Sequence, residues 1–180
     1  MTHGDDKSDP GSLGLALNAL RIDPYNPDWP VLYEIERKKL SESPGCLCLA
    51  HIGSTAVPGL SAKPIVDIAM RIDSTLHRDS IFNFLREAGY IHHGEYGLPG
   101  REFFTRGDPP VIHLHVVNEI SPHWHAWINF RNYLRQHPDC ARQYEIEKKR
   151  LIMEAGINRN AYTIAKSVFI QNVLSKATSE

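Results

Sequence analysis

The segment HIGSTAVPGLSAKPIVDI, residues 51–68, joins two apolar runs and decides the fold of the chain. The first run ends in Gly53-Ser54, which predicts a strand followed by a tight turn. Gly53 allows a close backbone approach, Ser54 and Thr55 offer hydroxyl and N–H donors, and a helix beginning there would direct its positive end at an anion. Asp67 lies inside the second run, where an ionised carboxylate needs a cation or a donor as its partner. The segment therefore predicts a phosphate-binding loop followed by a metal carboxylate; a purely structural turn is the alternative.

Apolar periodicity and breakers divide the rest of the chain into short elements. Strands are expected at 47–52, 65–70, 90–93, 101–106 and 111–117, and helices at 30–40, 79–88, 123–136, 138–155 and 160–175. The strands at 101–106 and 111–117 flank a Gly-Asp-Pro-Pro turn, which is typical of an antiparallel hairpin. A sheet followed by helices to the end of the chain predicts an α+β domain.

His113 and His115 lie two residues apart on one expected strand. Side chains alternate along a strand, so both imidazoles share one face and can ligate a metal together. Imidazole shifts the preferred ion from Mg²⁺ toward Mn²⁺, Zn²⁺ or Ni²⁺. A hydrogen-bonded structural pair is the alternative. His123 and His125 flank Trp124 at a helix start, where a capping or exposed role is the simpler interpretation.

The segment 51–68 resembles the hallmark of the GrpB family, which is similar to a branch of the polymerase-beta-type nucleotidyltransferases. Further matching pieces are residues 23–30, 97–101, 113–117, 131–135 and 161–167. The resemblance implies a nucleotidyltransferase-like mixed sheet flanked by helices, with a helical C-terminal part. It implies one domain over 21–180. The polar, Asp/Gly/Ser-rich start of the chain predicts a flexible extension over 1–20, and a short helix in its second half is an alternative.

The resemblance also implies a function and a set of site residues. A nucleoside triphosphate would bind at Gly53, Ser54 and Thr55, with a divalent metal (Mg, Mn, Zn or Ni), and a nucleotidyl group would pass to an unknown acceptor. The expected roles are catalysis for Asp67 and His51, phosphate binding also for Lys63, Arg101, Tyr162 and Lys166, and metal binding for Asp67, His113 and His115. A hydrogen-bonded strand-end role is the alternative for His51, and an ordinary surface position is the alternative for Lys63, Arg101, Tyr162 and Lys166.

One departure from the wider superfamily bears on catalysis. Two-metal enzymes of this type carry a second carboxylate two residues after the first, and Ala69 stands there in this chain. A catalytically degenerate nucleotide-binding or accessory module is therefore an alternative, for example in coenzyme A biosynthesis, because the resembled family includes fusions to a kinase of that pathway. A His/Asp metal-dependent hydrolase is another. If Mg²⁺ binds, Glu34 or Glu36 is a candidate for the missing carboxylate.

The composition limits the classes of partner that the chain is expected to bind. The 180 residues carry a net charge of −1, with 42% hydrophobic and 23% charged residues, as in an ordinary globular protein. No bulk basic field supports sequence-independent nucleic-acid binding, and no apolar run of about 18 residues predicts a membrane span. Three cysteines and the absence of a signal-like N-terminus favour a reducing cytoplasmic setting. The expected partners are a nucleotide and an unknown acceptor or protein.

Overall fold

The computed structural model describes residues 13–16, 19, 21–75, 78–155 and 159–177, with the side chains of residues 155 and 159–165 left out of the description. Five helices and five strands follow one another along these residues. Their bounds are α1 (Asp28–Leu40), β1 (Cys46–Ile52), β2 (Val66–Ile72), α2 (Arg78–Glu87), β3 (Ile91–His92), β4 (Glu102–Arg106), β5 (Ile112–Asn118), α3 (Pro122–Gln136), α4 (Pro138–Ala155) and α5 (Arg159–Ala177).

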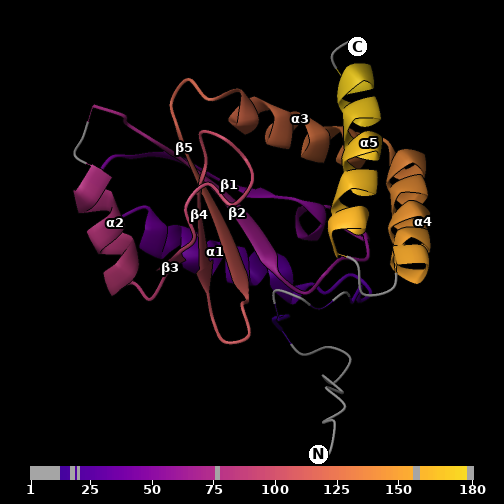
Figure 1. The fold of residues 1–180 in the computed structure, drawn as a ribbon, viewed down its shortest axis with the longest axis horizontal. Coiled ribbons are helices and arrows are strands. Elements are labelled where there is room, and N and C mark those ends of the chain that lie inside the picture. The colour runs from indigo at the N-terminus through magenta and orange to yellow at the C-terminus, as the bar shows by residue number, and fades with distance from the viewer. Residues whose placement is uncertain (1–12, 17–18, 20, 76–77, 156–158, 178–180) are drawn as a thin grey trace, which may run out of the picture.

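The strands form one mixed sheet in the order β1-β2-β5-β4-β3 (Figure 1). β2 and β5 run parallel at its centre, and the remaining pairs are antiparallel. The register places Asp67 beside His113, and Ala69 beside His115. This α+β architecture agrees with the expected fold class, and the predicted β4–β5 hairpin is confirmed.

The first face of the sheet carries the main hydrophobic core, under α1 and α2. Ile68 and Leu114 from the central strands are fully buried there, against Trp29 of α1 and Ile81 and Leu85 of α2. Each such side chain contributes roughly 1.5–3 kcal/mol relative to an exposed position. The stable central strands therefore fix where their alternate residues emerge on the opposite face.

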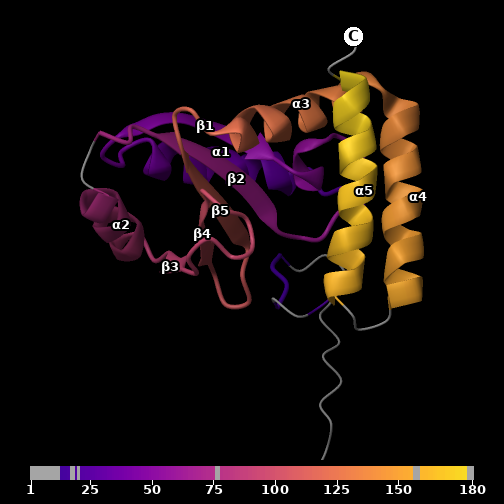
Figure 2. The same ribbon diagram turned by 45° about the horizontal axis from the view of Figure 1, so that its top comes forward.

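The second face of the sheet is only partly covered. Helix α3 packs Trp124, Trp127 and Ile128 against Ala50, Ile52 and Ala69. Helices α4 and α5 lie side by side beyond α3 at one end of the sheet (Figure 2). Asp67, His113 and His115 alternate with the core residues along β2 and β5, so they emerge on this second face.

Two expectations about local structure are corrected. The turn after Gly53 forms only a three-residue 3₁₀ helix, Ser54–Ala56, and not the start of a longer helix. Pro58 explains this, because the residue before a proline is disfavoured in helical conformation, and Val57 is extended with φ −105° and ψ 112°. A helix dipole therefore does not contribute to anion binding at this loop.

The N-terminal part of the chain also differs from the expected extension. Residues 13–16 contact the fold: Gly14 N–H donates to Pro64 O, Leu15 N–H donates to Pro110 O, and Leu15 is buried. The folded part therefore includes these four residues, whereas residues 1–12 lie outside the described range. No helix of the described chain is long and apolar enough to cross a bilayer.

Candidate functional site

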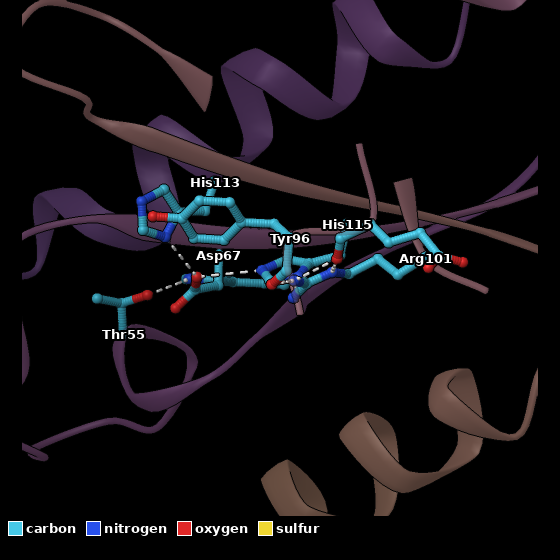
Figure 3. A network of polar contacts seen from close by, with 8 residues as sticks. Thr55, Asp67, Tyr96, Arg101, His113 and His115 are labelled. Carbon is cyan, nitrogen blue, oxygen red and sulfur yellow. Dashed lines mark hydrogen bonds and ion pairs between the residues drawn. The ribbon is translucent and has the colours of Figure 1, made fainter. Parts of the chain in front are cut away.

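Asp67 is the centre of a polar cluster on the second face of the sheet (Figure 3). Its Oδ1 accepts hydrogen bonds from His113 Nδ1 at 3.2 Å and from His115 Nε2 at 3.3 Å. Burial alone would raise the pKa of this carboxyl, but the two imidazole donors outweigh it and hold the pKa well below its usual range. The structure thus brings the two histidines that the strand pattern placed on one face together with Asp67, which the family resemblance placed on the neighbouring strand.

Arg101 determines which nitrogen of His115 carries the proton. Its Nη1 lies 3.2 Å from His115 Nδ1, and a guanidinium has no acceptor, so Nδ1 must accept. Burial lowers the pKa of His115 despite the adjacent carboxylate, so the ring is neutral and its proton lies on Nε2, facing Asp67. The guanidinium is held by the backbone oxygens of Glu95 and Tyr96. Arg101 therefore acts on the cluster through His115.

The proton on His115 bears on the expected metal. An ion between Asp67 and His115 would need a lone pair on Nε2, where the proton lies. Within the described ranges, no group of three His, Cys, Asp or Glu side chains is arranged to hold an ion. In this arrangement the cluster fits a hydrogen-bonded carboxylate and not a bound metal; metal binding, which requires His115 to lose its Nε2 proton, stays a prediction.

Gly53 places the loop directly against the carboxylate. Its φ of 71° and ψ of −168° lie in a region that only glycine occupies readily. A Cβ at this position would stand 2.7 Å from Asp67 Oδ2. The glycine is therefore required for backbone conformation and for close approach at the same time.

Two arginines of α3 hold the loop from one side. Arg131 Nη1 donates to His51 O at 3.0 Å, and Arg135 donates to Ala56 O through both Nε and Nη2. Helix α4 holds it from another side, because Glu145 accepts from Ser61 Oγ at 2.8 Å. The loop is thus fixed in place by the C-terminal helices.

Lys148 of α4 is a site residue that the sequence interpretation missed. It is 2% exposed, and its Nζ donates to Ser54 Oγ at 3.2 Å and to Ser61 O at 2.5 Å. Burial is the main reason that its pKa falls from 10.5 to about 7, and the charge of Lys166 lowers it further. A lysine held in this way gains its proton more readily when an anion binds beside it.

A small polar cavity lies where the loop, β2 and helices α4 and α5 meet. We call it the lysine cavity; its volume is about 60 Å³. Its polar lining consists of Ser54, Thr55, Lys63, Asp67, His113, Lys148 and Lys166. Six of these seven residues were expected from the sequence to bind phosphate or metal, and Lys148 is the one that was not.

Other expected site residues lie elsewhere. His51 is on the first face of the sheet, 5% exposed, stacked on Tyr33 of α1 at 4.9 Å, with Nε2 3.0 Å from Thr55 Oγ1. It supports the loop and does not reach the lysine cavity. Arg101 does not line that cavity, and the side chain of Tyr162 lies outside the described residues.

The first helix does not supply a missing carboxylate. Glu36 is fully buried under the first face, where it accepts from Tyr90 at 2.7 Å and from Arg106. Glu34 pairs with Arg37 on the exposed side of the same helix. Both glutamates are therefore excluded from the Asp67 cluster.

Comparison with known proteins identifies relatives over most of the chain. The family model described as "GrpB protein" matches residues 19–176. A crystal structure of the conserved protein GrpB from Enterococcus faecalis superimposes with a TM-score of 0.79 and 31% identity, covering 87% of this chain and 96% of that one.

Curated relatives differ in length. The glutamate-rich protein GrpB of Alkalihalophilus pseudofirmus is 30% identical, over 91% of this chain and 99% of its own. UPF0157 protein YqkA of Bacillus subtilis is 31% identical, and this chain spans about half of its length (51%). A dephospho-CoA kinase of Mycolicibacterium paratuberculosis is 23% identical over 91% of this chain and 47% of its own.

Proposed function

The chain belongs to the GrpB family, and from that premise we propose that it binds a nucleotide, with a terminal phosphate group in the lysine cavity. The proposal is carried by one observation. Lys63, Lys148 and Lys166 line a cavity in which Asp67 is the only carboxylate among the described lining residues. Cationic side chains gathered in a small, partly desolvated space favour an anion strongly.

The residues of the lysine cavity offer two kinds of donor to a phosphate group. Lys148 Nζ and Ser54 Oγ already lie within hydrogen-bond distance, so both can turn to a phosphate oxygen without a change of fold. Ammonium groups bind phosphate as point charges, and hydroxyls add directional donors. The clamps from Arg135 and Glu145 fix the loop in advance, which lowers the entropic cost of binding.

Nucleotidyl transfer to an unknown acceptor is the reaction that the resemblance implies, and it is the activity we propose to test. In that reaction the acceptor oxygen bonds to the α-phosphorus, the bond from that phosphorus to the bridging oxygen breaks, pyrophosphate leaves and the acceptor proton passes to solvent water. Asp67 is ionised and could take that proton only against its lowered pKa. No step is assigned to a metal, because the cluster does not fit one.

A nucleotide-binding accessory module is the second candidate, favoured by Ala69. This residue is fully buried and packs in the apolar cluster with Trp124 and Trp127, where a second carboxylate would stand in a two-metal enzyme. The similarity to a dephospho-CoA kinase, which covers 47% of that protein's length, suggests coenzyme A biosynthesis as one setting.

Two measurements test these candidates. Thermal unfolding with each nucleoside triphosphate, with and without divalent ions, should show a rise in the midpoint, because a ligand bound only to the folded state stabilises it. Pyrophosphate release would support transfer, and binding without release would support the accessory module. No nucleotide-dependent rise in the midpoint would contradict the proposal.

A further inference from the structure

A second, larger cavity adjoins the lysine cavity. Its volume is about 310 Å³, and it lies between α3, α5 and the turn at residue 98. We call it the aromatic cavity. Its apolar and ring-bearing lining includes Leu98, His123, Trp127, Phe130, Ile170 and Leu174.

The two cavities share Asp67 and Lys166 in their linings. The lysine cavity, at about 60 Å³, has the volume of roughly two water molecules and cannot hold a whole nucleotide. A ligand with a phosphate there must extend past these two residues. The aromatic cavity is of the size that small-molecule sites have, roughly 300–1,000 Å³.

The rings of the aromatic cavity form a stacking surface. Trp127 and His123 are stacked with centroids 5.8 Å apart and an angle of 24° between their planes. The Trp127 ring also lies 5.3 Å from His115, which hydrogen-bonds to Asp67. Aromatic side chains of this kind can stack on any nucleobase, since each nucleobase has a π face.

We propose that the aromatic cavity binds the nucleobase of the nucleotide whose terminal phosphate occupies the lysine cavity. This inference rests on the proposed function and adds the location of the second half of the ligand. The sugar then lies at the junction, beside Asp67 and Lys166. The surface is general for planar heterocycles, so binding depends on the presence of a base more than on which base it is.

The test compares ligands that share phosphates and differ in the base. Inorganic tripolyphosphate and each of ATP, GTP, CTP and UTP are titrated calorimetrically into the full chain. Trp127→Leu removes the aromatic face but keeps an apolar side chain against Ala69. Ala126→Phe instead fills the cavity, which Ala126 lines. Trp124→Leu is the matched control, because Trp124 packs in the same cluster as Trp127 but does not line the cavity.

The wild type and Trp124→Leu should prefer at least one nucleoside triphosphate to tripolyphosphate by about tenfold or more. Trp127→Leu and Ala126→Phe should abolish that preference and leave tripolyphosphate binding unchanged. Tripolyphosphate binding without any nucleotide preference in the wild type overturns the inference and leaves the proposed function standing. Absence of tripolyphosphate and nucleotide binding overturns both. Circular dichroism separates loss of fold from loss of binding. The two cavity variants act in opposite ways, because Trp127→Leu removes side-chain volume from the cavity and Ala126→Phe adds it.

Discussion

The Nζ atom of Lys148 lies 3.2 Å from the Oγ atom of Ser54, although 94 residues separate the two in the chain. This bond ties the phosphate-type loop of the sheet to helix α4. The same helix holds Ser61 through Glu145. The loop therefore depends on the C-terminal helices for its position, and any function of the loop depends on them as well.

Anion binding should take up a proton near neutral pH. The pKa of Lys148 in the free protein is about 7, so above pH 7 most molecules must protonate this lysine before it can bind an anion. Affinity for tripolyphosphate should fall by up to about tenfold for each pH unit above 7. Calorimetry in buffers of different ionisation enthalpy measures the number of protons taken up on binding. This proton uptake should vanish in Lys148→Met. The same uptake in the variant would show that another group titrates.

His51 should make the fold sensitive to acid. Burial lowers its pKa in the folded state to about 4, against about 6.5 in the unfolded chain. The unfolded chain therefore binds the proton first, and the stability contributed by neutral His51 is lost as pH falls from about 6.5 to 4, by roughly 3 kcal/mol. His51→Gln keeps a hydrogen-bonding group for Thr55 but does not titrate. Urea unfolding should give a shallower loss of stability between pH 7 and 4 in this variant, and an identical slope would contradict the assignment.

A methyl group at Gly53 should disturb the loop and the carboxylate together. Gly53→Ala is expected to cost about 1–3 kcal/mol from backbone strain, with a further loss from the contact with Asp67 Oδ2. Gly59→Ala is the matched control, because Gly59 also has a positive φ of 76° but nothing lies within 4 Å of its Cβ position. Denaturant unfolding should show the larger loss at Gly53. Equal losses would mean that the carboxylate moves aside freely.

Arg101 should oppose metal binding. It holds the proton of His115 on Nε2 by donating to Nδ1, and its charge adds repulsion. Arg101→Met should therefore raise affinity for Mn²⁺ or Zn²⁺ by about tenfold or more, and His115→Ala in that background should remove the gain. Tight Mg²⁺ binding by the wild type, unaffected by His115→Ala, would show that the histidines are not involved in holding an ion.

The alternation of side chains predicted which residues of one strand share a face, and the family resemblance predicted which strands are neighbours. His113 and His115 share a face because they are two residues apart, and the resemblance to the GrpB family placed their strand beside that of Asp67. The faces are decided by burial, because Leu114 and Ile68 must enter the core. Of the roles that the sequence left open for His51, the structure favours the hydrogen-bonded strand-end role over the catalytic one, because the β1–β2 register pairs it with Ile68 and not with Asp67.

Lys148 was missed because it lies in a run of charged residues that is typical of a solvated helix. Its signal was present in the spacing: Tyr144, Lys148 and Leu151 fall at i, i+4 and i+7, and all three are buried. A lysine on the apolar stripe of a helix needs a polar environment inside the fold. The aromatic cavity could not be predicted, since it depends on how α3 and α5 pack on the sheet.

Phosphate binding in the lysine cavity can be measured by calorimetric titration with tripolyphosphate at pH 6.5. Lys148→Met removes the buried ammonium, whereas Lys38→Met makes the same change on the exposed side of α1. Charged hydrogen bonds contribute about 1.5–3 kcal/mol, so Lys148→Met should weaken binding by at least about tenfold and Lys38→Met should leave it unchanged. Equal affinities for the wild type and Lys148→Met would contradict phosphate binding in this cavity.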